Sequence, residues 1–402
     1  MIVKPKIRGF ICTTAHPVGC AHNVQRQIDY VLGHGPIKDG PKKVLVLGAS
    51  TGYGLASRIV AAFGSRAETV GVFFEKEADG KRTATAGYYN SVALEEKILA
   101  EGLYTRSVNG DAFSDEVKQQ VVEILKRDVG PVDLVVYSVA APRRVHPRTG
   151  KVSKSVLKPV GRGYTNKSID MQNAALEEVT LPAATEEEIE QTVAVMGGED
   201  WHYWIDILEE NGLLADGVTT VAYSYIGPEV TQGVYRNGTI GRAKDHLERT
   251  ANELDARLKK INGRALISVN KALVTQSSSA IPFIPLYFVI LSKVMKEKGL
   301  EEDTVMQIDR LFRDFLYSGE PPATDEAGFI RLDDRELRDD VQAIVNERWD
   351  QLTQETLSGL ADLEGYQSDF LRLFGFGLPG VDYDADVDVG RTLPSLKESP
   401  AS

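Results

Sequence analysis

The chain has 402 residues, a length that corresponds to two or three average domains or to one enlarged domain. Its 58 Asp and Glu residues outnumber 46 Lys and Arg residues, and the net charge of −12 argues against a general affinity for nucleic acid or for anionic membranes. With 42% hydrophobic and 26% charged residues, the composition is that of an ordinary globular protein, which excludes disordered and fibrous classes.

The N-terminal sequence predicts a cytoplasmic protein, because it never accumulates the roughly 7–15 apolar residues of a signal peptide. The most apolar later stretch, 280–290, contains Pro282 and Pro285 and is shorter than the roughly 20 residues of a spanning helix. We therefore expect no membrane span. Cys12 and Cys20, the two cysteines, fit a reducing compartment.

From residue 43 onward, short apolar runs alternate with amphipathic stretches, as in a parallel sheet covered by crossover helices. This pattern predicts an α/β fold with a doubly wound, Rossmann-type parallel sheet. The apolar runs are 44–47, 69–74, 103–108, 134–139, 218–225 and 265–269, with helical patterns at 53–63, 91–101 and 114–127.

We expect one enlarged domain over residues 1–402. Its parts are an N-terminal extension (1–42), a cofactor-binding core (43–140), a large insertion after the fourth strand (141–217), a catalytic and C-terminal helical part (218–390) and a tail that frays (391–402). In the insertion, Thr185 to Glu188 is a capping-box pattern that opens a helix, and a second amphipathic stretch covers 200–210. We expect this folded material at one edge of the sheet. Further helices are expected at 283–297, 301–317 and 338–358.

A glycine-rich turn, Gly48-Ala49-Ser50-Thr51-Gly52-Tyr53-Gly54, follows the first apolar run. Glycines between a strand and a helix let backbone N–H groups and the positive helix end approach a pyrophosphate. The strict G-x-G-x-x-G pattern is not met, because Ser57 stands at the third glycine position. Many such turns contain glycine for steric reasons alone, so a purely structural role stays open.

Glu75, at the end of the second run, favours a dinucleotide. It lies 75 − 54 = 21 residues past the last glycine, near the roughly 20 residues expected for the acid that binds the adenosine ribose. A carboxylate accepts hydrogen bonds from the 2′-hydroxyl and repels a 2′-phosphate, so NADH is favoured over NADPH. The adjacent Lys76 could soften this preference, and a solvated strand end is the alternative.

The next two strand ends point toward the same edge of the sheet, where ligands of such folds bind. Asp111, followed by Ala112, could meet the adenine amino group. Small residues at Val139 and Ala140 would let the nicotinamide ribose lie close. Each of these residues, taken alone, is equally a turn residue.

Four polar residues, Tyr223, Tyr225, Tyr235 and Lys244, follow or end the fifth run. A phenol can donate a proton or stabilise an enolate oxygen, and a nearby ammonium can lower a tyrosine pKa and hold ribose hydroxyls. The 244 − 235 = 9 residues between Tyr235 and Lys244 would place them on opposite faces of one unbroken helix. Asn237-Gly238 predicts instead a loop at Tyr235 with the helix starting beyond it. Strand-end packing and a surface charge are the alternative roles.

Together, the glycine turn, Glu75 and Tyr235-x8-Lys244 resemble the FabV-type NADH-dependent enoyl-[acyl-carrier-protein] reductases, relatives of the trans-2-enoyl-CoA reductases in the extended short-chain dehydrogenase/reductase superfamily. The resemblance covers nearly the whole chain, and the Tyr-x8-Lys spacing is its most specific element. It implies a monomer that uses NADH to reduce the C2=C3 double bond of trans-2-enoyl thioesters of CoA or acyl carrier protein, the final reduction of type II fatty acid elongation.

The resemblance also implies roles for single residues. Tyr235 would be the proton donor, Lys244 would bind NADH and Tyr225 would contact the substrate thioester, although the residues alone leave open which tyrosine transfers the proton. The implied NADH contacts besides Lys244 are Gly48, Ala49, Ser50, Thr51, Gly52, Tyr53, Phe74, Glu75, Asp111, Ala112, Val139, Ala140, Leu273, Val274 and Thr275.

Residues 143–167 contain eight basic side chains and no Asp or Glu. We hypothesise that part of this stretch meets the phosphates of CoA or the acidic surface of acyl carrier protein. A solvated basic hairpin is the alternative. The segment 277–286 predicts either a flap over an acyl tunnel or a buried connection into a helix.

No metal is expected. The spacing of Cys12, His16, Cys20 and His22 matches no standard zinc site, and the aspartates of 382–388 lack the glycine and the bidentate acid of a calcium loop. Two other functions stay open: a carbonyl reductase of the same superfamily, and a non-catalytic NADH sensor.

Overall fold

Seven parallel strands form the central sheet, in the order β13-β12-β11-β6-β3-β4-β5. The structure is a computed structural model that describes residues 1–8, 11–171, 173–275, 278, 281 and 283–397. In chain order the strands are β3 (Lys43–Leu47), β4 (Glu68–Phe73), β5 (Thr105–Asn109), β6 (Val132–Tyr137), β11 (Leu214–Ser224), β12 (Arg264–Val269) and β13 (Phe329–Arg331).

The strand order reverses between β3 and β6, which pair in parallel register with Val44 opposite Leu134. Ligands of doubly wound sheets bind at such a switch point, beyond the carboxyl ends of the strands. Each of the six apolar runs overlaps one of the first six strands of this sheet, so the predicted Rossmann-type sheet is confirmed. The three-residue strand β13 was not predicted, because it is too short to produce a periodic pattern.

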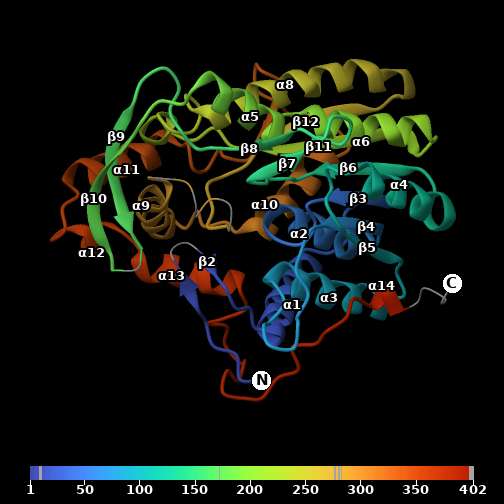
Figure 1. The fold of residues 1–402 in the computed structure, drawn as a ribbon, viewed down its shortest axis with the longest axis horizontal. Helices are drawn as coiled ribbons and strands as arrows, with labels where there is room; N and C mark the ends of the chain where they lie inside the picture. The colour runs from blue at the N-terminus through green and yellow to red at the C-terminus, as the bar shows by residue number, and fades with distance from the viewer. Residues whose placement is uncertain (9–10, 172, 276–277, 279–280, 282, 398–402) are drawn as a thin grey trace.

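Helices cover both faces of the sheet (Figure 1). Successive side chains of β3 show the two layers: Val44 and Val46 belong to one core cluster, and Leu45 and Leu47 belong to the other. The first layer contains α1 (Pro17–Gly33), α2 (Gly52–Ile59), α3 (Ala86–Ala100) and α10 (Thr304–Arg310), and the second contains α4 (Asp115–Ile124), α6 (Glu199–Glu210) and α8 (Thr239–Leu258).

Some predicted helices differ in length from those observed. Helices α2, α4 and α10 each continue as a wider π-helical turn, over Val60–Gly64, Leu125–Val129 and Leu311–Leu316. The expected helix at 301–317 is therefore α10 with its π turn. The helix expected at 338–358 is the shorter α11 (Asp339–Gln351), and α9 (Ile284–Glu297) matches its prediction.

The insertion folds as two hairpins and two helices. The hairpins are β7–β8 (Arg143–Val145 and Val152–Lys154) and β9–β10 (Tyr164–Asp170 and Ala175–Leu181), and the helices are α5 (Glu186–Met196) and α6. The predicted capping box at Thr185 and Glu188 is confirmed. The expected edge position is wrong for α6, because Trp201 and Trp204 are fully buried in the core on one face of the sheet.

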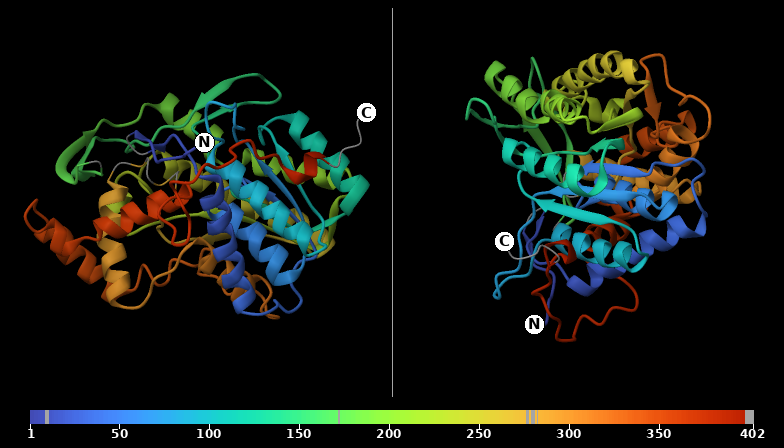
Figure 2. Two further views of the ribbon diagram at one scale, coloured as in Figure 1. Left: turned by 90° about the horizontal axis from the view of Figure 1, so that it is seen from below. Right: turned by 90° about the vertical axis from the view of Figure 1, so that its right-hand side faces the viewer.

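The hairpin β9–β10 and the C-terminal helices form a lobe beside the sheet, as both Figure 1 and the left view of Figure 2 show. Strand β9 contacts α9, and α9 packs against α11 and α13. The remaining elements are β1 (Ile7–Arg8), β2 (Ile11–Cys12), α7 (Glu229–Gln232), α12 (Leu357–Leu360), α13 (Leu363–Leu373), α14 (Pro394–Lys397) and the 3₁₀ turn Lys259–Ile261.

Both ends of the chain are attached to the rest of the protein. Helix α1 was not predicted within the N-terminal extension, although His16 caps it by accepting a hydrogen bond from the Gly19 N–H, and Pro17 occupies its first position. The tail was expected to fray, yet Ser395 donates two hydrogen bonds of 3.0 Å to the buried Glu95. Residues 398–402 of that tail lie outside the described part. Among the described helices, none is both long and apolar enough to cross a membrane.

Candidate active site

The glycine turn sits at the switch point between β3 and β6. Gly48 has φ +84°, and a Cβ atom on it would lie 2.1 Å from the Ser138 carbonyl oxygen at the end of β6. A Cβ on Gly54 would lie 2.0 Å from the Gly48 carbonyl oxygen. These two glycines are therefore required by close backbone approach. The side chain of Thr51 makes no capping hydrogen bond at the N-terminus of α2, an arrangement suited to an anion.

Glu75 turns back onto this loop. Its Oε1 accepts a hydrogen bond of 2.7 Å from the Ser50 hydroxyl. Burial raises the pKa of the Glu75 carboxyl, and hydrogen bonds from Thr85 and Ser50 oppose the shift. Asn109, at the end of β5, fixes the Glu75 backbone through two hydrogen bonds of 2.8 and 3.0 Å. Sequence reasoning missed Asn109, whose only signal was its position at a strand end.

The other predicted cofactor residues lie at neighbouring strand ends, with differing exposure. Phe74 is 78% exposed, and Val139 and Ala140 follow Ser138 at the partly open end of β6. The Asp111 carboxylate accepts a hydrogen bond from the Phe113 N–H, which forms a local turn. The Ala112 carbonyl accepts hydrogen bonds from Lys118 Nζ and from the Trp204 indole N–H. Its polar partners therefore belong to α4 and α6 of the second core layer.

The segment 273–275 follows β12, in the other half of the sheet from β3, and reaches the glycine turn. Thr275 lies near Gly52, since a Cβ on that glycine would be 3.9 Å from Thr275 Cγ2. The Tyr53 hydroxyl bonds to the Lys271 carbonyl at 2.8 Å and to Gln307 Oε1 at 3.0 Å. Of the segment 277–286, predicted as a flap or a buried connection, residues 277, 279–280 and 282 lie outside the described part.

The tyrosines and the lysine lie around the end of β11. Tyr235 lies in the turn between α7 and α8, and α8 begins at Thr239 just beyond Asn237-Gly238, as predicted. The Tyr235 ring packs edge-to-face on Tyr225, with centroids 4.8 Å apart and an interplanar angle of 80°. Lys244 Nζ donates a hydrogen bond of 3.0 Å to the Tyr223 carbonyl.

The hydroxyls of these tyrosines differ in their partners. Tyr223 shares a hydrogen bond of 2.6 Å with Ser57 Oγ of α2, and Tyr225 donates one of 3.0 Å to Glu336 Oε1. No described residue forms a hydrogen bond with the Tyr235 hydroxyl, although this side chain is only 7% exposed. Of these three tyrosines, Tyr235 is therefore the one whose hydroxyl no described residue engages.

Burial sets the ionisation of the site. It raises the pKa of Tyr235 far above its usual range, so the phenol keeps its proton. Burial also lowers the pKa of Lys244 to about 8, with Glu248 opposing the shift and Arg236 adding to it. The site thus holds a protonated phenol, Tyr235, and a lysine, Lys244, whose ammonium can lose its proton in mildly alkaline solution.

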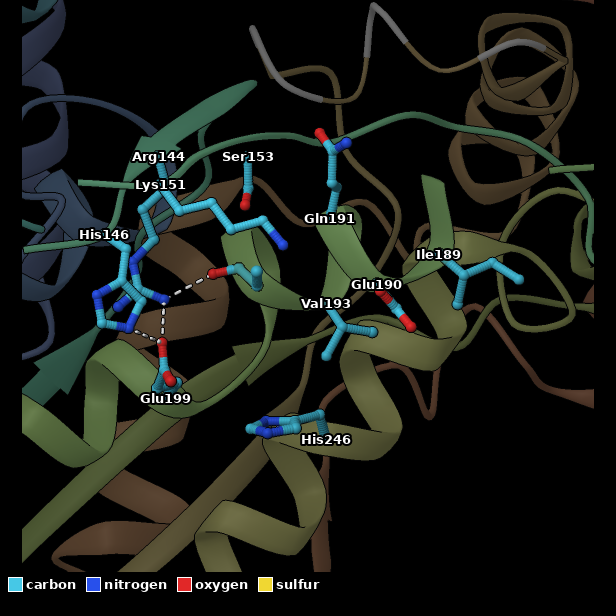
Figure 3. A pocket seen from close by; sticks show the side chains of 11 residues that line it. Arg144, His146, Lys151, Ser153, Ile189, Glu190, Gln191, Val193, Glu199 and His246 are labelled. Carbon is cyan, nitrogen blue, oxygen red and sulfur yellow. Dashed lines mark hydrogen bonds and ion pairs between the residues drawn. The ribbon is translucent and has the colours of Figure 1, made fainter. Parts of the chain in front are cut away.

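The basic stretch 143–167 is only partly available to a ligand. Arg144 is 2% exposed and pairs with Glu199 at 2.6 Å, Lys158 pairs with Glu188, and Lys167 Nζ donates to the Trp349 carbonyl at 2.8 Å. Figure 3 shows Arg144, His146 and Lys151 along one side of a cavity of about 420 Å³, with α5 and His246 on its other sides. The exposed cations of the stretch are Arg143, Arg148, Lys151, Lys154 and Arg162.

In the part of the chain that the structure describes, no group of three or more His, Cys, Asp or Glu side chains could hold a metal ion. Cys12 and Cys20 are buried, unpaired thiols. The acidic stretch 382–388 instead pairs with the N-terminal segment, through Lys4 with Asp384 and the terminal amine with Asp386.

The strand order and the glycine turn at the switch point define a dinucleotide-binding α/β protein. Comparison with family models narrows this class. Residues 82–317 match the trans-2-enoyl-CoA reductase catalytic region, and residues 2–80 match the NAD(P)H binding domain of trans-2-enoyl-CoA reductase. The chain belongs to the trans-2-enoyl-CoA reductase family, which confirms the resemblance seen in the sequence.

Individual relatives agree with this assignment. An enoyl-[acyl-carrier-protein] reductase [NADH] of Opitutus terrae is 58% identical over 96% of this chain and 98% of its own, and one of Coxiella burnetii is 55% identical over 100% and 99%. The trans-2-enoyl-CoA reductase of Clostridium acetobutylicum in complex with NADH superposes with a TM-score of 0.95, at 44% identity over 98% and 100% of the two chains. That of Treponema denticola with NAD gives 0.92, at 49% identity over 96% and 98%.

A third family model, described as an enoyl reductase FAD binding domain, matches residues 324–387. In this range α11 and α13 pack against α9. Tyr366 and Asp369 of the range line a cavity of about 70 Å³ that also contains Glu301 and Glu302, whereas ligand pockets measure about 300–1,000 Å³. This cavity is too small to hold FAD.

Proposed function

We propose that the protein is an NADH-dependent reductase that saturates the C2=C3 double bond of trans-2-enoyl thioesters, in the last step of the fatty acid elongation cycle. The observation that carries the proposal is Tyr235, a buried phenol without a described hydrogen-bond partner, which packs against Tyr225 just beyond the strand end whose Tyr223 carbonyl binds Lys244. The named relatives and the NADH complexes of the family support the same activity.

The cofactor contacts follow from the strand ends. Residues 48–53 and the N-terminus of α2 would hold the pyrophosphate, Glu75 the adenosine ribose, and Lys244 the nicotinamide ribose. Asp111, Ala112, Phe74, Val139, Ala140 and the segment 273–275 would complete the pocket. The Glu75 carboxylate favours NADH over NADPH. When bound, NADH supplies the hydride that adds to C3 of the substrate.

Tyr235 would act at the other end of the double bond. Its hydroxyl would donate to the thioester oxygen, stabilise the enolate that forms, and supply the proton that C2 finally gains. Lys244 would keep the region positive, which favours the developing negative charge. Tyr225 would contact the thioester region of the substrate.

The test is NADH oxidation with crotonyl-CoA and with acetoacetyl-CoA as alternative substrates. We expect turnover of crotonyl-CoA alone, and a loss of kcat of about 100-fold or more in Tyr235→Phe, with NADH binding retained. Preferential turnover of acetoacetyl-CoA would indicate a carbonyl reductase instead. NADH binding without turnover of either substrate, and without an effect of Tyr235→Phe, would indicate an NADH sensor.

We further propose that the protein works as a monomer in the cytoplasm, with CoA or acyl carrier protein thioesters as its partners and no role in nucleic acid binding. The net charge of −12 supports the last point. Light scattering coupled to size-exclusion chromatography tests the oligomeric state, and a dimer mass at micromolar concentration would refute it.

A further inference from the structure

Glu336 lies at the centre of a buried hydrogen-bond network that joins two parts of the candidate site. Its side chain is 0% exposed, in the segment between β13 and α11. Its Oε1 atom accepts hydrogen bonds from the hydroxyls of Tyr225 at 3.0 Å and Tyr287 at 2.7 Å. Its Oε2 atom accepts one from the Ala272 N–H at 2.6 Å. Three separate segments of the chain therefore meet on one carboxylate.

The Ala272 contact fixes the start of the segment 273–275. Lys271 Nζ donates to the Ala272 carbonyl at 3.1 Å, and the Lys271 carbonyl accepts from the Tyr53 hydroxyl at 2.8 Å. Both polar groups of Ala272 are thus bonded inside the protein. The backbone that enters the proposed nicotinamide pocket is held at its first residue and connected to α2.

The Tyr225 contact fixes the neighbour of the proposed proton donor. Tyr225 has one hydroxyl proton and donates it in the hydrogen bond to Glu336 Oε1, so this phenol is not free to donate to a thioester oxygen. Its ring forms the edge-to-face contact with Tyr235, whose own hydroxyl has no described partner. The network therefore separates the roles of the two tyrosines, with Tyr225 as a fixed wall and Tyr235 as the donor.

We propose that Glu336 is a positioning residue of the reductase. Acting through Tyr225, it holds the Tyr235 phenol at a fixed position relative to the backbone of the segment 273–275. The inference rests on the proposed function. A buried carboxylate is tolerated only when donors satisfy it, and here donors from three segments do so, which makes their relative positions depend on this one group.

The first test replaces Glu336 by Gln, which keeps the shape of the side chain. An amide nitrogen cannot accept a hydrogen bond, so at least one of the three donors loses its acceptor. We expect kcat with crotonyl-CoA to fall roughly tenfold to 100-fold, because Tyr235, the proposed proton donor, is then misplaced. NADH should still bind at the glycine turn and Glu75. Fluorescence titration measures NADH binding separately from turnover.

The matched control is Asp333→Asn. Asp333 is also a buried carboxylate of this segment, 1% exposed, but its hydrogen bonds of 2.8 and 2.7 Å go to Arg331. This variant should lower the melting temperature and leave kcat unchanged. If Glu336→Gln also lowers only the melting temperature, the proposed role of Glu336 is wrong.

A double-mutant cycle with Tyr225→Phe tests the path of the effect. If Glu336 acts through Tyr225, the double variant loses no more kcat than the worse single variant, whereas independent defects multiply. Multiplied losses would overturn the inference. Should Glu336→Gln not fold, Glu336→Asp, which keeps the charge and shortens the side chain, is judged by the same criteria. A folded wild-type protein that never turns over crotonyl-CoA would refute the proposed function, and with it this inference.

Discussion

Lys244 of α8 donates a hydrogen bond of 3.0 Å to the backbone carbonyl of Tyr223, the penultimate residue of β11. The Tyr223 hydroxyl in turn shares a hydrogen bond of 2.6 Å with Ser57 on the helix that follows the glycine turn. An ammonium on one layer is thereby tied to the end of a central strand and to the cofactor helix of the other layer.

The pH dependence of NADH use should report Lys244. Since burial lowers the pKa of this residue to about 8, its ammonium is lost as the pH rises through that value. We expect kcat/KM for NADH to fall above about pH 8, and Lys244→Met to remove this dependence and to cost about 10- to 100-fold at neutral pH, the worth of one charged hydrogen bond. An unchanged alkaline limb in the variant would show that another group titrates.

The same residue makes a prediction for stability. Burial lowers the pKa of Lys244 from the ordinary value of 10.5 to about 8 in the folded protein. Between these two pH values, Lys244 is mostly protonated in the unfolded chain and mostly neutral in the folded one, so stability rises with pH there. The contribution of Lys244 to the free energy of unfolding is therefore fully present above that interval and is lost as the pH falls through about 8. Urea unfolding across this range should show a shallower rise in Lys244→Met than in the wild type.

Cofactor preference should depend on Glu75. Replacing it by Gln removes the charge that repels a 2′-phosphate but keeps the side chain beside Ser50. We expect the ratio of kcat/KM for NADPH to that for NADH to rise about tenfold, which corresponds to roughly 1.4 kcal/mol. Glu77→Gln, at an exposed carboxylate two residues away, is the control and should leave the ratio unchanged. Equal ratios in both variants would contradict the assignment of Glu75 to the ribose.

Gly48 should tolerate no side chain. Gly48→Ala combines the strain of a positive φ with a Cβ atom 2.1 Å from the Ser138 carbonyl oxygen. Gly80→Ala is the control, because its φ of +79° is similar and nothing lies within 4 Å of the added atom. The control should cost about 1–2 kcal/mol of unfolding free energy, and Gly48→Ala should cost more and weaken NADH binding. Similar losses of stability, with NADH affinity intact in both, would argue against close approach at the turn.

The exposed part of the basic stretch should affect the carrier-bound substrate alone. Reversing Arg143, Lys151 and Lys154 to Glu should raise KM for the acyl-carrier-protein thioester about tenfold at low salt and less at high salt, with KM for NADH unchanged. Reversing Lys38, Lys42 and Lys260, exposed cations near the amino ends of the strands, produces the same net charge as a control. Equal KM values in the two variants would leave the stretch as a solvated hairpin.

The sequence by itself determined the sheet and the position of the cofactor turn. The signals were apolar runs of strand length, glycines at the end of the first strand and Glu75 at the end of the second. Each depends on backbone conformation within a few residues, which the local composition and spacing of the sequence reflect. Asn237-Gly238 likewise determined where α8 begins, and therefore that Tyr235 precedes it.

Only the tertiary structure decided which side chains share a partner. Arg144 belongs to a basic run in the sequence, but packing buries it against Glu199, 55 residues away. Glu336 lies in a charged segment that gives no local signal, and its bond to Tyr225 spans 111 residues. Such contacts depend on how whole layers pack, because burial in a low-dielectric interior selects the polar pairs that satisfy each other, whatever their distance along the chain.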